Sequence, residues 1–60
     1  MENLRDRLLR FHNETGESYK QIAIDCGIGI NTMYSFTGGY RELKVAYRNI
    51  LNEYLVSKGY

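Results

Sequence analysis

The chain has 60 residues, which is enough for one domain and excludes a modular enzyme with a second hydrophobic core. It contains one cysteine, Cys26, and one histidine, His12, so an internal disulfide and a Cys/His zinc cluster are both excluded. A chain of this size hides only about 60% of the surface that its unfolded form exposes, which leaves self-association as the remaining source of added stability.

The composition is that of an ordinary folded domain, with 43% hydrophobic and 25% charged residues. The formal charge is only +1, but residues 1–17 sum to −1 and residues 18–48 sum to +2, so the middle of the chain is its basic part. Because the first residues carry charges in place of an apolar signal core and no long apolar run follows, we expect a cytoplasmic protein with no membrane partner.

The first predicted helix begins after Asn3, a favourable N-cap residue. Leu4, Leu8 and Phe11 recur at helical spacing and form its apolar face, and Gly16 is expected to end it.

The second predicted helix opens with Ser18, followed three residues later by Gln21. This spacing predicts a capping box, in which each side chain bonds the main-chain N–H of the other residue. Gly27 is expected to end the helix in a sharp turn that requires positive φ. Its inward face consists of Ile22, Ala23 and Cys26, and a buried packing role is expected for that cysteine.

The third predicted helix covers residues 30–37 and ends at Gly38 and Gly39. At 100° per residue, Thr32, Met33 and Phe36 share its inward side. Its other side carries mixed chemistry without charge: Ile30, Asn31, Tyr34 and Ser35.

The closing helix is predicted to begin near Arg41 or Glu42, to run to about residue 58 and to stop at Gly59. Its core-facing stripe is predicted to comprise Leu43, Ala46, Tyr47, Ile50, Leu51 and Tyr54, which fall within about 140° of arc. The four, or at most five, helices with no strand candidate predict an all-α domain over residues 1–60.

The opposite side of the closing helix carries four residues at spacings of 4, 3 and 4, which is the spacing of a short heptad seam. These dimer candidates are Val45, Asn49, Asn52 and Val56. The alternative is that two exposed valines are ordinary surface. Three other apolar residues, Leu9, Ile24 and Leu55, are rival positions for a dimer or a protein partner.

Residues 18–39 resemble the helix-turn-helix unit of the lambda-repressor/Cro-like family. The matching features are a polar cap at Ser18, then Ile22 and Ala23, the turn glycine Gly27, an apolar residue at Ile28, and inward residues at Met33 and Phe36 before Gly39. Leu8, Phe11, Gly16, Leu43 and Ile50 also match, so the resemblance covers about residues 4–55. It implies a compact lambda-repressor-like DNA-binding domain.

Carried over residue by residue, the resemblance places the family's base-reading positions on Ile30, Asn31, Tyr34 and Ser35. It places the DNA-backbone role on Tyr19, Lys20 and the segment after Gly39, where Arg41, Lys44 and Arg48 would face phosphates. Asparagine can bond both edge groups of an adenine and isoleucine can contact a thymine methyl group. Because the outward face has no Arg, Lys or Gln, an A·T-rich site is favoured.

The resemblance implies a sequence-specific transcriptional regulator that binds double-stranded DNA as a homodimer and represses by occupying an operator, like small phage-type repressors. No catalytic residues, cofactor, metal or small-molecule substrate are expected, since no histidine stands near Ser18 and a chain of this size has little room for a pocket. The alternative is a protein-interaction module, such as an anti-repressor or an inhibitor of a host protein, that buries Ile24, Leu9 or the face of the third helix.

Overall fold

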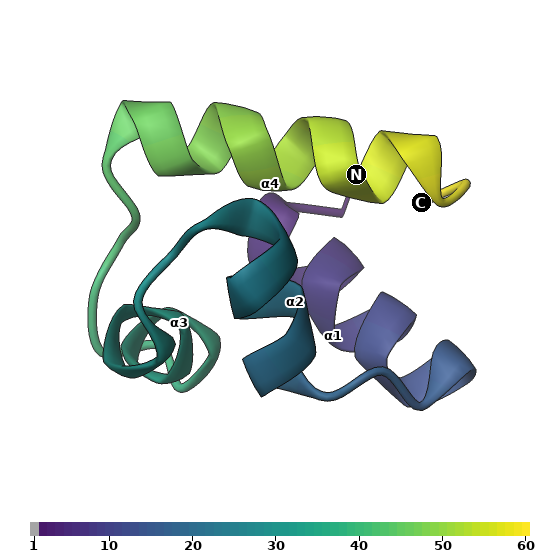
Figure 1. The fold of residues 1–60 in the computed structure, drawn as a ribbon, viewed down its shortest axis with the longest axis horizontal. Helices are drawn as coiled ribbons and strands as arrows, with labels where there is room; N and C mark the ends of the chain where they lie inside the picture. Colours follow the sequence, from purple (N-terminus) through teal and green to yellow (C-terminus); the bar gives the residue numbers. More distant parts are fainter. Residues whose placement is uncertain (1) are drawn as a thin grey trace.

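The computed structural model describes residues 2–60 and contains four helices and no strand in that range: α1 (Leu4–Thr15), α2 (Tyr19–Cys26), α3 (Ile30–Thr37) and α4 (Val45–Ser57). Helix α4 lies across α1 and α2 in Figure 1. Helix α3, which is seen along its axis at the lower left, lies beside α2. The helix pairs that pack together are α2 with α3, α1 with α4, α1 with α3, and α2 with α4. The all-α class with four helices is therefore confirmed.

Local signals set the ends of α1 and the start of α2. The Oδ1 atom of Asn3 accepts a 2.8 Å hydrogen bond from the main-chain N–H of Asp6, as expected of an N-cap. The Oγ atom of Ser18 accepts from Gln21 N at 3.1 Å. The reciprocal half of the predicted capping box is wrong, because the Gln21 side chain donates instead to Oδ1 of Asp25, 3.0 Å away and one turn further along the helix.

The turn between α2 and α3 depends on Gly27, whose φ is +70°. A residue with a Cβ would pay about 1–2 kcal/mol for this conformation. The chain then continues with Ile28, whose N–H donates to the carbonyl oxygen of Ala23 at 2.9 Å and whose side chain is buried. The turn thus both ends α2 and inserts an apolar side chain between the two helices.

A single cluster of buried residues forms the core. Every helix contributes to it, and Met33 and Phe36 attach α3 from its inward side as predicted. Its members are Leu8, Phe11, Ile22, Ala23, Cys26, Ile28, Met33, Phe36, Leu43, Leu51 and Leu55.

The prediction for the closing helix is wrong in its start and in part of its face. The helix begins at Val45, with Lys44 as a cap that has an extended backbone and makes no side-chain bond. Within the helix, Ala46 is exposed and Ile50 is 42% exposed, whereas Leu55, predicted to be a stray surface residue, is fully buried.

This error has a simple geometric cause. Leu43 is buried as predicted, but it precedes the helix and therefore does not fix the helix's rotational phase. Without it, the buried Leu51 and Leu55 and the half-buried Tyr47 and Tyr54 define a core face rotated toward Leu55.

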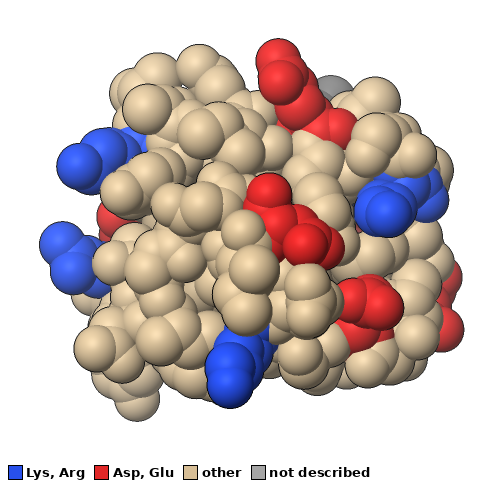
Figure 2. Space-filling model, in the orientation of Figure 1, with Lys and Arg blue, Asp and Glu red and all other residues tan. Residues whose placement is uncertain are grey.

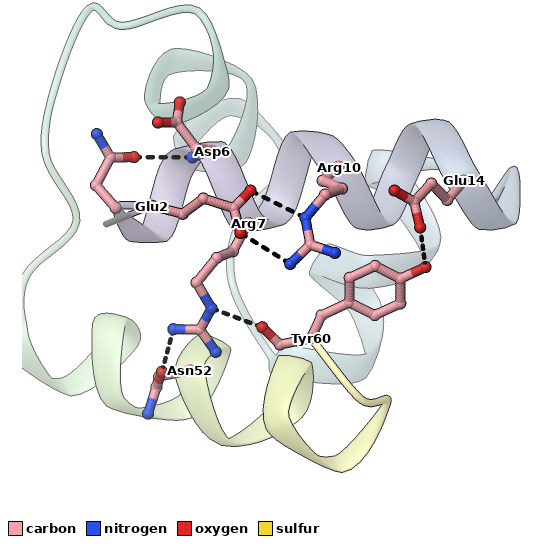
Figure 3. A network of polar contacts seen from close by, with 8 residues as sticks. Glu2, Asp6, Arg7, Arg10, Glu14, Asn52 and Tyr60 are labelled. Atoms are coloured by element: carbon pink, nitrogen blue, oxygen red, sulfur yellow. Dashed lines mark hydrogen bonds and ion pairs between the residues drawn. The ribbon is translucent and has the colours of Figure 1, made fainter.

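Arginines of α1 connect this helix to the end of the chain (Figure 3). Arg7 donates from Nε to the carbonyl oxygen of Tyr60 at 2.7 Å and from a terminal nitrogen to Oδ1 of Asn52 at 2.6 Å. Arg10 forms two hydrogen bonds, of 2.8 and 2.9 Å, with the carboxylate of Glu2. The Tyr60 hydroxyl donates to Glu14 at 2.7 Å. Arg7 and Arg10 therefore form their hydrogen bonds within the fold.

Candidate nucleic-acid interface

Two of the four predicted base-reading side chains are well exposed on the outward side of α3. Asn31 is exposed, and 52% of the surface of Tyr34 is accessible to solvent. Ile30 and Ser35 are half-buried, and Ile30 packs against the core cluster. The face that α3 offers to a ligand is therefore centred on an amide and a phenol.

Tyr19, predicted to contact the DNA backbone, is held inside an aromatic stack. Its ring lies parallel to the imidazole of His12, with ring centres 4.0 Å apart, and meets the Tyr34 ring edge-on at 6.2 Å. Burial raises the pKa of the Tyr19 phenol. This packing makes Tyr19 a support for Tyr34, and His12 is half-buried in the same stack.

Seven of the eight Lys and Arg side chains fall into two groups, and the eighth, Lys58, lies over the ring of Tyr54 near the end of the chain. The arginines of α1 bond within the chain, and Arg5 bonds the carbonyl oxygen of Phe36 at 2.6 Å and lies 3.4 Å from the carboxylate of Glu42. The cations predicted to face phosphates are all exposed: Lys20, Arg41, Lys44 and Arg48. The ammonium group of Lys44 lies over the ring of Tyr47, 5.0 Å from its centre.

Two contacts tie the segments that carry Lys20 and Arg41 to α3. The N–H of Arg41 lies 3.3 Å from the carbonyl oxygen of Ser35, which holds the segment after α3 against that helix. Lys20 follows Tyr19, whose ring contacts Tyr34. In Figure 2, the surface over α3 at the lower left is mostly uncharged, and Lys and Arg atoms lie at its margins. The arrangement is an uncharged polar and aromatic face with cations at its edges.

Comparison with protein-family models, curated proteins and solved structures gave no match. The family resemblance of residues 18–39 stays a prediction from the sequence.

Tyr40 is a candidate contact residue that the sequence reasoning missed. It is 87% exposed, and its N–H donates to the carbonyl oxygen of Ser35 at 2.9 Å. Its ring lies over Gly38, where a Cβ atom would come within 2.8 Å of the ring. Since φ of Gly38 is an ordinary −79°, the glycine there makes room for the ring and not for an unusual backbone. The sequence signal was an aromatic residue directly after the Gly38–Gly39 pair.

The predicted seam on the closing helix lies on the surface. Val45 and Val56 are 66% and 60% exposed, and Asn49 and Asn52 are exposed between them. Asn52 also has a contact within the chain, through its hydrogen bond from Arg7 (Figure 3).

Cys26 is buried as expected, and burial raises the pKa of its thiol, so the reactive thiolate is disfavoured. Residues 2–60 contain no group of three His, Cys, Asp or Glu side chains placed to hold a metal ion. Among the helices of this range, none has the length and apolar character needed to cross a membrane.

Proposed function

We propose that the protein is a sequence-specific regulator that binds double-stranded DNA through α3 and the segments beside it, using α2 and α3 as a helix-turn-helix. The observation that carries the proposal is the separation of its cations. Arginines of α1 are bonded within the fold, whereas Lys20, Arg41 and Lys44 are exposed in the segments that precede and follow the uncharged face of α3. A duplex can bind both features, because its phosphates attract cations and its base edges form hydrogen bonds with polar groups such as an amide.

Within this proposal, Asn31 and Tyr34 read bases in the major groove. Asn31 bonds an adenine edge, and Tyr34, held by Tyr19, contacts a base or a phosphate oxygen. Ile30 and Ser35 are half-buried, so only their exposed atoms contact DNA. For Ile30 the expected contact is a thymine methyl group. The lambda-repressor-like fold belongs to the same proposal, as does a cytoplasmic site of action.

The regulator acts by occupancy. It binds an operator as a homodimer and excludes a polymerase or a competing regulator, without catalysis, cofactor or small ligand. If two copies read DNA about a two-fold axis, the operator is a near-palindrome with half-site centres about 34 Å apart.

Selection from a pool of random-sequence duplexes, followed by footprinting of the enriched sequences, tests the proposal. The expected result is an A·T-rich near-palindrome protected in two half-sites. Failure to enrich any sequence would contradict sequence-specific binding, and a single asymmetric protected half-site would contradict the two-fold dimer.

A protein-interaction module is the second candidate, favoured by the exposure of Ile24, which is 62% accessible on α2. On this account the α3 face and Ile24 bind a protein, and α2 and α3 are a scaffold. The result that favours it is DNA binding unchanged by Asn31→Ala, Arg41→Ala and Lys44→Ala, together with loss of a host protein partner in Tyr34→Ala.

A further inference from the structure

The outward side of α4 carries an exposed stripe that is partly apolar and that contacts α1 at one edge, where Arg7 bonds Asn52. Leu51 and Leu55 bury the side of the helix that faces the core. The stripe runs through Val45, Asn49, Asn52 and Val56. The exposed Ala46 lies beside it, about 60° from Asn49, and the partly exposed Ile50 lies further round the helix. Valines stand at the two ends of the stripe and asparagines between them. Their spacings of 4, 3 and 4 residues are those of a two-stranded coiled coil.

Two charged residues flank this stripe on opposite sides. With Asn49 and Val56 at positions a of a heptad and Val45 and Asn52 at positions d, Arg48 occupies position g and Glu53 the following position e. At 100° per residue, they lie about 70° to either side of the stripe. In residues 2–60, neither side chain forms an ion pair; the carboxylate of Glu42, which lines a surface hollow with Arg48, is bonded by Arg5 instead.

We propose that a second copy of this chain covers the stripe, with the two α4 helices parallel and with Arg48 of each copy paired to Glu53 of the other. In a parallel pair, each position g faces the position e five residues further along the other helix, which brings these opposite charges together twice. In an antiparallel pair, each flank faces its own copy, so Arg48 faces Arg48 and Glu53 faces Glu53. Charge complementarity therefore selects both the occupant and its direction.

The asparagines fit the same arrangement. Asn49 at position a faces the Asn49 of the second copy, and a polar pair at this position fixes register at a cost in affinity. Asn52 has its side-chain oxygen held by Arg7 at 2.6 Å, which leaves its amide nitrogen as the donor at the seam (Figure 3). The interface spans less than four turns of helix, so the dimer is weak in the absence of other contacts.

This inference deepens the homodimer part of the proposed function and rests on that part alone. It moves Arg48 from the predicted DNA-backbone set to the dimer interface, and leaves Lys20, Arg41 and Lys44 for phosphates. Because self-association is measured without DNA, failure of the dimer and failure of DNA binding are separate results.

Sedimentation equilibrium of the full chain, up to millimolar concentration, tests the charge pairing. R48E and E53R should each weaken self-association by about tenfold, since two attractive pairs become repulsive. An equimolar mixture of the two variants, and the double variant R48E/E53R, should restore it. K20E, which makes the same charge change away from α4, is the matched control. Circular dichroism checks that each variant is folded, which is expected because all these positions are exposed.

Disulfide trapping tests the direction. In a parallel pair, V45C places its thiol beside that of the second copy, whereas in an antiparallel pair the two thiols lie at opposite ends of the interface, beyond disulfide reach. Cys26 is buried and does not compete, and K20C is the control. A parent that stays monomeric at millimolar concentration, or a dimer indifferent to R48E and E53R, would overturn the proposal. A dimer that V45C does not cross-link would overturn the parallel direction.

Discussion

Arg5 in α1 donates a 2.6 Å hydrogen bond from Nε to the carbonyl oxygen of Phe36, near the C-terminal end of α3. Its guanidinium group also lies over the Phe36 ring, 4.7 Å from the ring centre. The carbonyl groups of the last turn of a helix lack partners within the helix and carry the negative end of its dipole, so a cation is favourable there. Arg5 thereby fixes the end of the helix that presents Asn31 and Tyr34.

Replacing Arg5 with alanine should lower the free energy of unfolding by about 1–2 kcal/mol, because the Phe36 carbonyl loses a charged hydrogen-bond donor and the Phe36 ring loses its contact with the guanidinium group. Urea denaturation followed by circular dichroism measures the change. Lys20→Ala, which removes an exposed positive charge, is the control and should have little effect. Equal stability of the two variants would show that the Arg5 contact does not stabilise α3.

Leu55→Ala should cost about 2–5 kcal/mol and leave much of so small a domain unfolded, because the leucine is fully buried. Ile50→Ala should cost less than about 1 kcal/mol, because 42% of that residue is exposed. Both are measured by urea denaturation at low protein concentration, where self-association is absent. A larger loss of stability for Ile50→Ala than for Leu55→Ala would contradict the observed core face and favour the one predicted from the sequence.

Stability should fall at alkaline pH. The hydrogen bond to Glu14 raises the pKa of the Tyr60 phenol, and burial raises the pKa of Tyr54 and of the Cys26 thiol. Because the folded chain favours the neutral forms, this stabilisation is complete below the unfolded-state pKa values and is lost as pH rises through the folded-state values.

Urea midpoints measured from about pH 8 to about pH 11 test this dependence, since phenols ionise near pH 10. Tyr60→Phe removes the phenol that bonds Glu14, so its midpoint should be lower than that of the parent at pH 8 and should fall less steeply toward pH 11. Parallel pH profiles for parent and variant would contradict the role of the Tyr60–Glu14 bond.

Base reading and phosphate contact should respond differently to mutation. Asn31→Ala should cost about 1–3 kcal/mol on the selected site and relax the preference at one base pair, with little change in salt dependence. Arg41→Ala and Lys44→Ala should weaken binding to all sequences alike and reduce the salt slope by about one unit each. Fluorescence anisotropy with matched and scrambled duplexes separates the two patterns, and an Asn31→Ala effect that is equal on both duplexes would contradict base reading.

The parts of the fold that were predictable depend on signals from neighbouring residues. Asn3 and Ser18 cap helices and Gly27 makes its turn through contacts within about five residues, and α3 was predicted with its observed bounds. The phase of α4 was not predictable in this way. No capping side chain marks its start at Val45, and Leu43, although buried, lies outside it.

For the candidate site, helical periodicity predicted the exposure of Asn31 and Tyr34. It did not predict the half-burial of Tyr19 against His12, nor the contact of Arg5 with Phe36, which lies 31 residues away in the chain. Such contacts depend on how the helices pack. The sequence alone therefore did not predict which cations bond within the chain and which are exposed to a partner.

Binding of duplex DNA by α3 and the cations beside it is tested most directly by a titration of the protein against random-sequence duplex at two salt concentrations. We expect binding at low salt that weakens steeply as salt rises. The logarithm of the binding constant should fall with the logarithm of the salt concentration with a slope of about −0.9 for each phosphate contacted. Absence of binding at low salt, or binding that does not change with salt, would contradict DNA binding through α3.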